Sequence, residues 1–87
     1  MATYIISYDL RNNRNYDRLY EAIKSYGTWA KITESTWAVK TDSSAVAVRD
    51  HLGSILDSDD RIFVIKSGVE AAWRNAIGKN SWLKENL

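Results

Sequence analysis

The sequence predicts one α+β domain, in which a four-stranded antiparallel sheet carries two helices on one face and a helical C-terminal tail follows. The hydrophobic period along the 87 residues alternates between that of a strand and that of a helix, in the order strand, helix, strand, strand, helix, strand. The chain has four Gly, no Pro and no linker-like stretch, so residues 1–87 are expected to form a single domain. This order is the split βαβ, or ferredoxin-like βαββαβ, pattern.

The first predicted strand covers residues 3–9, where β-branched and aromatic side chains dominate. Tyr4, Ile6 and Tyr8 alternate onto one face of this strand, which we expect to pack against the helices. Asp9 then belongs to the opposite face, which is expected to stay open.

A polar loop over residues 11–15 leads into the first predicted helix. Its apolar side consists of Tyr16, Leu19, Tyr20 and Ile23. The helix is expected to end near Gly27, because Gly readily adopts the left-handed conformation of a helix C-cap. Two β-rich runs follow, over residues 28–34 and 35–41.

The second half of the chain begins with a cluster of N-cap residues at 42–44. The stripe of the second predicted helix consists of Ala45, Val48, Leu52, Ile55 and Leu56. A short apolar strand covers residues 62–65, and a capping-box pattern at 67–70 predicts a third helix that ends at Gly78. That helix would carry Val69, Ala72, Trp73 and Ala76. Residues 81–87 can add a last helical turn, so the tail over 68–87 is predicted to be helical.

Composition limits the function classes. The absence of Cys excludes disulfides, thiolate metal sites and cysteine nucleophiles, and it suits a reducing compartment. No stretch is apolar enough for a signal peptide or a membrane span, so we expect a cytoplasmic protein that does not act in a membrane. A net charge of +1 does not by itself indicate nucleic-acid binding. The thin core of so small a domain and its open sheet face favour a homodimer.

Residues 4–10 (YIISYDL), the Tyr26-Gly27 pair and residues 35–37 (STW) resemble the CRISPR-associated ferredoxin-like family, the small dimeric component of the spacer-integration complex. The related virulence-associated protein D ribonucleases share that architecture. The resemblance covers roughly residues 3–67. The sequence departs from the family where residues 33–37 read TESTW in place of Gln-x-Ser-Val-Phe. The tail also differs from the C-terminal fifth strand of that family.

The resemblance implies a homodimer in which Asp9 and its symmetry mate face each other across the interface. In active members of the family such aspartates hold a divalent cation that assists phosphodiester cleavage. Other members bind duplex DNA without that chemistry.

Asp9 is therefore the candidate catalytic and metal-binding residue. A carboxylate at a strand end can ligate a hard cation, and Mg²⁺ or Mn²⁺ sites use one or two carboxylates together with waters and substrate phosphate. Dimer symmetry would supply the second carboxylate. The alternative interpretation is that Asp9 caps the following loop through side-chain hydrogen bonds.

Arg11, Arg14 and Arg18 form the local basic cluster beside Asp9. The planar guanidinium binds phosphate bidentately, so these residues are candidates for holding the backbone of DNA or RNA. The alternative is a solvated surface in which an arginine pairs with a carboxylate at helical spacing.

Other polar and aromatic groups are assigned no site. Asp57, Asp59 and Asp60 lack the Gly and the distal Glu of a calcium loop and are interpreted as a polar turn. His51 is interpreted as a surface residue. The four Trp residues can stack on bases in single-strand binders, but packing in a core or an interface is the commoner role.

Three hypotheses for the function remain open from the sequence. The first is a homodimeric, metal-dependent endonuclease or ribonuclease that uses Asp9 of both chains. The second is a non-catalytic module of the same fold that binds DNA, RNA or a protein partner. The third is a toxin-like ribonuclease encoded beside an antidote.

Overall fold

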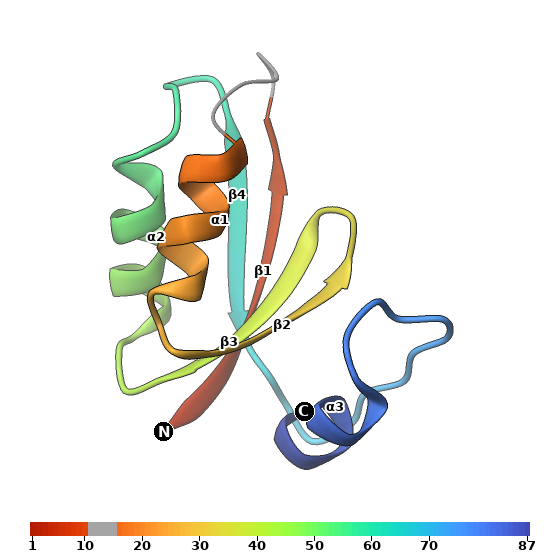
Figure 1. The fold of residues 1–87 in the computed structure, drawn as a ribbon. Coiled ribbons are helices and arrows are strands. Elements are labelled where there is room, and N and C mark those ends of the chain that lie inside the picture. Colours follow the sequence, from red (N-terminus) through yellow and green to blue (C-terminus); the bar gives the residue numbers. More distant parts are fainter. Residues whose placement is uncertain (11–15) are drawn as a thin grey trace.

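The computed structural model describes residues 1–10 and 16–87, and Figure 1 shows the fold. The elements are β1 (Ala2–Asp9), α1 (Tyr16–Lys24), β2 (Thr28–Thr33), β3 (Thr36–Thr41), α2 (Ala45–Gly53), β4 (Arg61–Lys66) and α3 (Asn80–Asn86). The strands form one sheet in the order β2-β3-β1-β4, and all three pairings are antiparallel. This arrangement confirms the predicted α+β fold of ferredoxin-like topology.

The main core lies between the sheet and the two helices α1 and α2, which cover the same face (Figure 1). The strand period of two places Tyr4, Ile6 and Tyr8 on this face, and all three are buried as predicted. The helices contribute apolar side chains that their spacing predicted, but α2 ends at Gly53, so the predicted members Ile55 and Leu56 lie in the turn that follows it. The fully buried ones are Leu19, Ile23, Val48 and Leu52.

The ends of α1 and α2 follow from local chemistry. Gly27 closes the turn after α1 with a φ of 89°, a conformation that is strained for residues with a Cβ, and its N–H donates to the carbonyl of Lys24 at 3.0 Å. Ser44 is the N-cap of α2, and its hydroxyl oxygen accepts a hydrogen bond from the Ala47 N–H at 3.1 Å. Both ends confirm the sequence-based prediction.

The predicted helix over residues 69–76 is wrong. The described residues 67–79 contain no regular helix, and the tail becomes helical only at Asn80. Val69 is fully exposed, so this member of the predicted stripe buries no apolar surface that would stabilise a helix. Asn75 adopts a φ of 57°, which interrupts a right-handed helix.

The segment before α3 instead makes backbone contacts with the sheet at both of its ends. The Ser67 N–H donates to the carbonyl of Thr3 at 2.8 Å, and the Ile77 N–H donates to the carbonyl of Ile32 on β2 at 2.9 Å. These hydrogen bonds satisfy backbone groups that a helix would otherwise have paired internally.

The helix α3 lies on the opposite side of the sheet from α1 and α2 (Figure 1). Its Leu83 is fully buried. The register places Ala30 and Ala38 on the sheet face that points away from α1 and α2, yet both residues are buried. The tail therefore covers the β2–β3 half of a face that the sequence predicted to be open.

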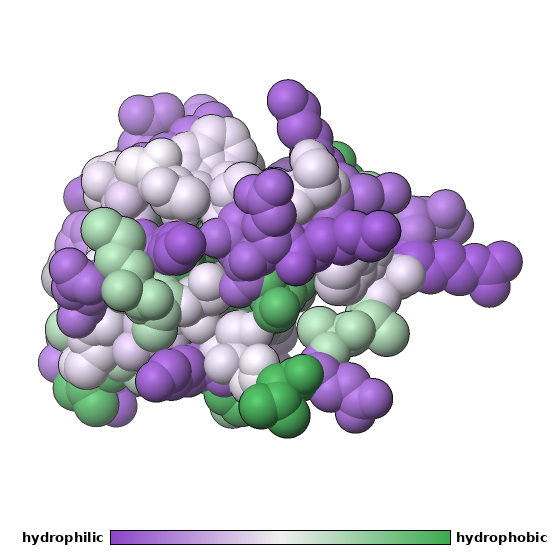
Figure 2. All heavy atoms as spheres, turned by 90° about the horizontal axis from the view of Figure 1, so that it is seen from below, coloured by the Kyte–Doolittle hydropathy of each residue, from purple (hydrophilic) through white to green (hydrophobic). Residues whose placement is uncertain are grey.

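The β1–β4 half of that face is not covered in the same way. Phe63 and Ile65 of β4 point to it, and they are 61% and 50% exposed. Seen from below, the molecule carries hydrophobic patches that are separated by hydrophilic side chains (Figure 2). No helix in the described ranges has the length and apolar character that crossing a membrane requires.

Candidate metal and nucleic-acid site

Asp9 is the last residue of β1 and lies on the sheet face that α1 and α2 do not cover. The antiparallel register places it opposite Arg61, the first residue of β4. One guanidinium nitrogen, Nη1 of Arg61, donates to Oδ2 of Asp9 at 3.0 Å. The structure thus pairs the predicted metal ligand with a cation that sequence reasoning missed. The predicted fold makes β1 and β4 antiparallel neighbours, and this adjacency was the signal that could have pointed to a partner for Asp9 on β4.

This ion pair leaves the Asp9 carboxylate accessible. The side chain of Asp9 is 59% exposed, and that of Arg61 is 65% exposed. An exposed pair of this kind contributes roughly 0–1 kcal/mol, since water and salt screen it. It joins one nitrogen to one oxygen and lacks the two-point geometry of the strongest arginine–carboxylate pairs. A divalent cation would therefore meet weak competition at Asp9.

The arginine cluster is only partly visible. Arg11 and Arg14 lie outside the described residues. Arg18 is exposed on α1, and among the described residues no ion pair joins it to Asp17 or Glu21. Phosphate contact by the three arginines stays a prediction.

The residue before Asp9 anchors this end of β1 in the core. The Tyr8 hydroxyl donates to the carbonyl of Glu34 at 3.2 Å and accepts a hydrogen bond from Nε1 of Trp37 at 3.0 Å. Burial raises the pKa of Tyr8 well above its usual value, so the phenol stays neutral. The rings of Tyr16 and Tyr20 pack beside it with centroid distances of 6.3 and 6.5 Å. Tyr8 thereby fixes the backbone from which Asp9 projects.

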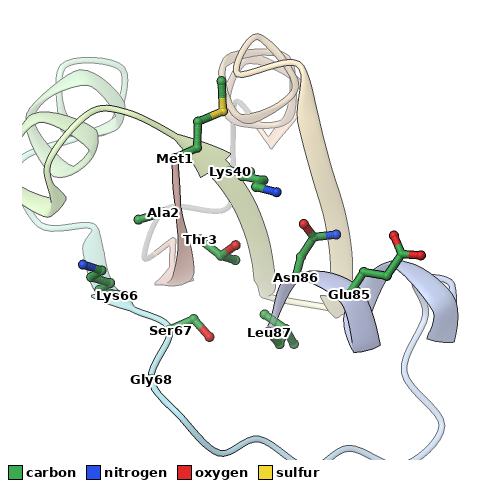
Figure 3. A pocket seen from close by; sticks show the side chains of 10 residues that line it. All are labelled: Met1, Ala2, Thr3, Lys40, Lys66, Ser67, Gly68, Glu85, Asn86 and Leu87. Carbon is green, nitrogen blue, oxygen red and sulfur yellow. The ribbon is translucent and has the colours of Figure 1, made fainter.

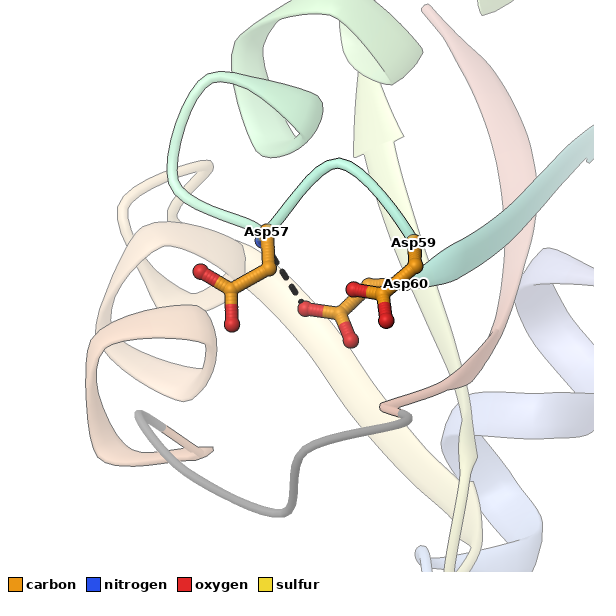
Figure 4. Close-up of side chains that lie close together, drawn as sticks. All are labelled: Asp57, Asp59 and Asp60. Carbon is orange, nitrogen blue, oxygen red and sulfur yellow. Dashed lines mark hydrogen bonds between the residues drawn. The ribbon is translucent and has the colours of Figure 1, made fainter.

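A second acidic group lies in the turn that precedes β4, where Asp57, Asp59 and Asp60 gather (Figure 4). One ligand oxygen from each lies within 4.8 Å of the others. The Asp57 N–H donates to Oδ2 of Asp60 at 2.9 Å, which closes the turn. This hydrogen bond supports the predicted polar turn, and the arrangement does not by itself assign a metal site.

A cavity lies at the other end of β1, away from Asp9 (Figure 3). It has a volume of about 370 Å³ and is lined by Met1, Ala2, Thr3, Lys40, Lys66, Ser67, Gly68, Glu85, Asn86 and Leu87. The Met1 ammonium is 3.4 Å from Oδ1 of Asp42. This cavity combines charges of both signs without a nucleophile–base pair, so we place no catalytic function there.

The comparison with protein families gives one match. The model of the family described as CRISPR associated protein Cas2 matches residues 1–75, which include every strand of the sheet together with Asp9 and Arg61. No solved structure matches the chain. The likeness to the virulence-associated protein D ribonucleases and the cytoplasmic location stay predictions. Because the family model matches most of its length, the chain belongs to the Cas2 family of CRISPR-associated proteins.

Proposed function

We propose that this chain acts as a homodimer that processes nucleic acid, as a metal-dependent endonuclease or ribonuclease. In this proposal Asp9 of each copy binds a shared Mg²⁺ or Mn²⁺ ion, and Arg11, Arg14 and Arg18 hold the phosphates of DNA or RNA. The Cas2 family match and the exposed carboxylate at the end of β1 support it.

The observation that carries the proposal is the position of Asp9 beside an uncovered apolar surface. Asp9, Phe63 and Ile65 lie on the same face of the β1–β4 half of the sheet. Exposed apolar side chains of this kind mark interaction sites. A second copy that buried them about a two-fold axis would bring its own β1, and with it a second Asp9, toward the first.

Two carboxylates that meet in this way repel each other, and a shared cation relieves that repulsion. Bound there, the ion would lower the pKa of a coordinated water and offset the charge of a phosphate. Arg61 would give up its pair with Asp9, at a cost of about 1 kcal/mol or less. Its guanidinium would then lie beside the metal, where a scissile phosphate needs a positive partner.

Cleavage assays with Asp9→Asn test this proposal. Purified protein is incubated with RNA and with DNA, in Mg²⁺, in Mn²⁺ and in chelator. We expect metal-dependent cleavage. It should fall by at least about 100-fold in Asp9→Asn, because the amide lacks the negative charge and one of the two oxygens with which the carboxylate would bind the metal. Asp17→Asn removes an equal charge from an exposed position on α1 and should cleave like the wild type. Equal cleavage by the wild type and by Asp9→Asn would end the catalytic proposal.

A second candidate function is a non-catalytic module that binds nucleic acid or a protein partner through the same dimer. The ion pair between Asp9 and Arg61 favours it, because the carboxylate already has a cationic partner. Binding affinity that falls steeply with salt would identify phosphate contacts, whereas a flat salt profile would indicate a protein partner. In this case Asp9→Asn would leave the affinity unchanged.

A further inference from the structure

The sheet face that α1 and α2 leave uncovered carries a row of apolar side chains across all four strands. The register aligns Ala30 of β2, Ala38 of β3, Ile5 of β1 and Ile65 of β4 in this row. Ile65 is 50% exposed, whereas Ala30 and Ala38 are buried. The tail (residues 68–87) therefore covers the half of the row that has small side chains, and the end with large side chains stays exposed at β4.

The tail is attached to the sheet at its middle and through one side chain of α3. The Ile77 N–H donates to the carbonyl of Ile32 at 2.9 Å. Beside it a Cβ on Gly78 would lie 3.3 Å from the Ala30 Cβ, so the tail backbone touches β2 there. Leu83 is fully buried, and the other residues of this fully described segment are exposed or half-buried. Two points of attachment therefore hold the tail in place.

Two side-chain hydrogen bonds lie within the tail itself. Nε1 of Trp73 donates to Oδ1 of Asn80 at 3.1 Å, and Nδ2 of Asn86 donates to the carbonyl of Trp82 at 2.9 Å. Release from the sheet does not break them, because both partners belong to the tail. The helix α3 has seven residues, and no side-chain hydrogen bond caps its N-terminus. Local opening begins at short, lightly packed elements of this kind, so the tail can leave while the sheet stays folded.

The exposed half of this face offers little area for a stable interface. Strands β1 and β4 pair over six residues, and strand spacing and rise give them a footprint of roughly 200 Å². A stable protein interface buries about 800 Å² on each partner. When the tail is released, all four strands become available and the footprint about doubles. Tight association through this face therefore needs the half that the tail covers.

We propose that the tail is a displaceable cover of a four-stranded interface, and that its release lets a second copy of this chain bind the whole face. The inference rests on the homodimer of the proposed function and adds a control of its assembly. A two-fold axis along the strands places Ile65 of each copy over Ala30 of the other. It likewise places Ile5 over Ala38, so large side chains meet small ones throughout the row. The same axis keeps both copies of Asp9 at one end of the interface.

A reversible crosslink tests this cover, because the chain has no Cys of its own. In the double variant Ala30→Cys with Gly78→Cys the Cβ atoms would start 3.3 Å apart, and a disulfide with a Cβ separation of about 3.5–4.5 Å needs a shift of a few tenths of an ångström. Sedimentation velocity compares the oxidised protein with the same protein in reductant. The oxidised form should associate at least about tenfold more weakly, because the locked tail abolishes the state that binds a second copy.

A second set of variants releases the tail. Leu83→Ser removes the buried anchor of α3 and should tighten association at least about tenfold, because a binding state populated at about 10% or less lowers the apparent affinity by that fraction. Lys84→Ala changes an exposed side chain of the same helix and should leave association unchanged. Adding Ala30→Glu to Leu83→Ser places a charge in the newly exposed half and should remove the gain. Hydrogen exchange of the β1 amides checks that the sheet stays folded in each variant.

Three results would overturn the cover: equal association of the oxidised and reduced forms, association of Leu83→Ser no tighter than that of the wild type, and a gain that persists after Ala30→Glu. The cleavage assays with Asp9→Asn judge the proposed function separately. Tighter association of Leu83→Ser without metal-dependent cleavage supports the cover and contradicts the nuclease. Cleavage that depends on Asp9, together with association that does not respond to the tail, contradicts the cover alone.

Discussion

The two faces of the sheet are covered in different ways. On one face α1 and α2 pack over a continuous aromatic and aliphatic core that includes Tyr8, Leu19 and Trp37. On the other face a short tail covers the β2–β3 half through Leu83, and apolar side chains of β4 stay exposed. The first face therefore supplies most of the stability, and the second carries the surface proposed to bind a second copy.

The largest difference between the faces should appear in two Leu→Ala variants. Leu19 and Leu83 are both fully buried. Leu19→Ala should lower the free energy of unfolding by about 2–5 kcal/mol, because it leaves a cavity in the central core. Leu83→Ala should cost less, because the seven-residue α3 can detach while the sheet stays folded. Urea denaturation measures both values.

Hydrogen exchange provides the control for that comparison. In Leu83→Ala the amides of α3 should lose protection while those of β1 keep it. Equal losses of protection in both elements would show that the tail is part of the same cooperative unit as the core, and the contrast between the faces would be wrong.

The next effect concerns the hydrogen bonds of the aromatic core. Tyr8→Phe removes the hydroxyl that accepts from Nε1 of Trp37 and donates to the Glu34 carbonyl. The indole N–H is then left without that partner in the core, which costs about 1–3 kcal/mol. Thermal denaturation measures the loss. Tyr4→Phe is the control, and a change as large as that in Tyr8→Phe would show that the hydrogen bonds are not its cause.

The sequence predicts the two faces of the sheet to different extents, because only one of them leaves a periodic pattern of apolar residues in the sequence. The period of two in β1 and the spacing of Leu19 and Ile23 predicted the core face correctly, because burial of one side imposes that pattern. Gly27 and Ser44 marked helix ends through local chemistry that does not depend on the rest of the fold.

The tail and the partner of Asp9 were not predictable in this way. The spacing of apolar residues at 69–76 suits a helix, but Val69 is fully exposed, and the Ile77 N–H is hydrogen-bonded to the edge strand β2 instead. Arg61 shows no periodic signal of its own, and its meeting with Asp9 depends on the register between β1 and β4. Contacts between distant segments decide both features.

The pH dependence of stability offers a smaller effect on the core face. Burial raises the pKa of Tyr8 above the usual tyrosine value of 10.0. Above pH 10.0 the unfolded chain therefore releases a proton that the folded chain retains, and stability falls as the pH rises. The stability that this shift contributes is fully present below that pH and declines by up to about 1.4 kcal/mol per pH unit above it. Tyr8→Phe should make the decline shallower in urea titrations, and an unchanged slope would contradict it.

Placing a charge on the exposed sheet face should change the free energy of self-association. Phe63→Lys should weaken self-association about tenfold or more, which corresponds to about 1.4 kcal/mol, because it puts a charge in the proposed interface. Val46→Lys alters an apolar residue on α2 that is 56% exposed and should leave association unchanged. Sedimentation velocity across a concentration series measures both variants. A wild type that stays monomeric, or equal effects in the two variants, would exclude the β1–β4 surface as the interface.

The smallest effect on stability, and the sharpest separation of stability from function, is expected at the exposed pair between Asp9 and Arg61. Asp9→Asn and Arg61→Ala should each change the free energy of unfolding by less than about 1 kcal/mol, because both side chains are more than half exposed. Their effects on metal binding should be opposite. Asp9→Asn removes the ligand, whereas Arg61→Ala removes a competing positive charge and should tighten Mn²⁺ binding in calorimetric titrations. If Arg61→Ala weakens Mn²⁺ binding, the carboxylate needs its guanidinium partner for correct placement, and the proposal that the two cations compete for Asp9 is wrong.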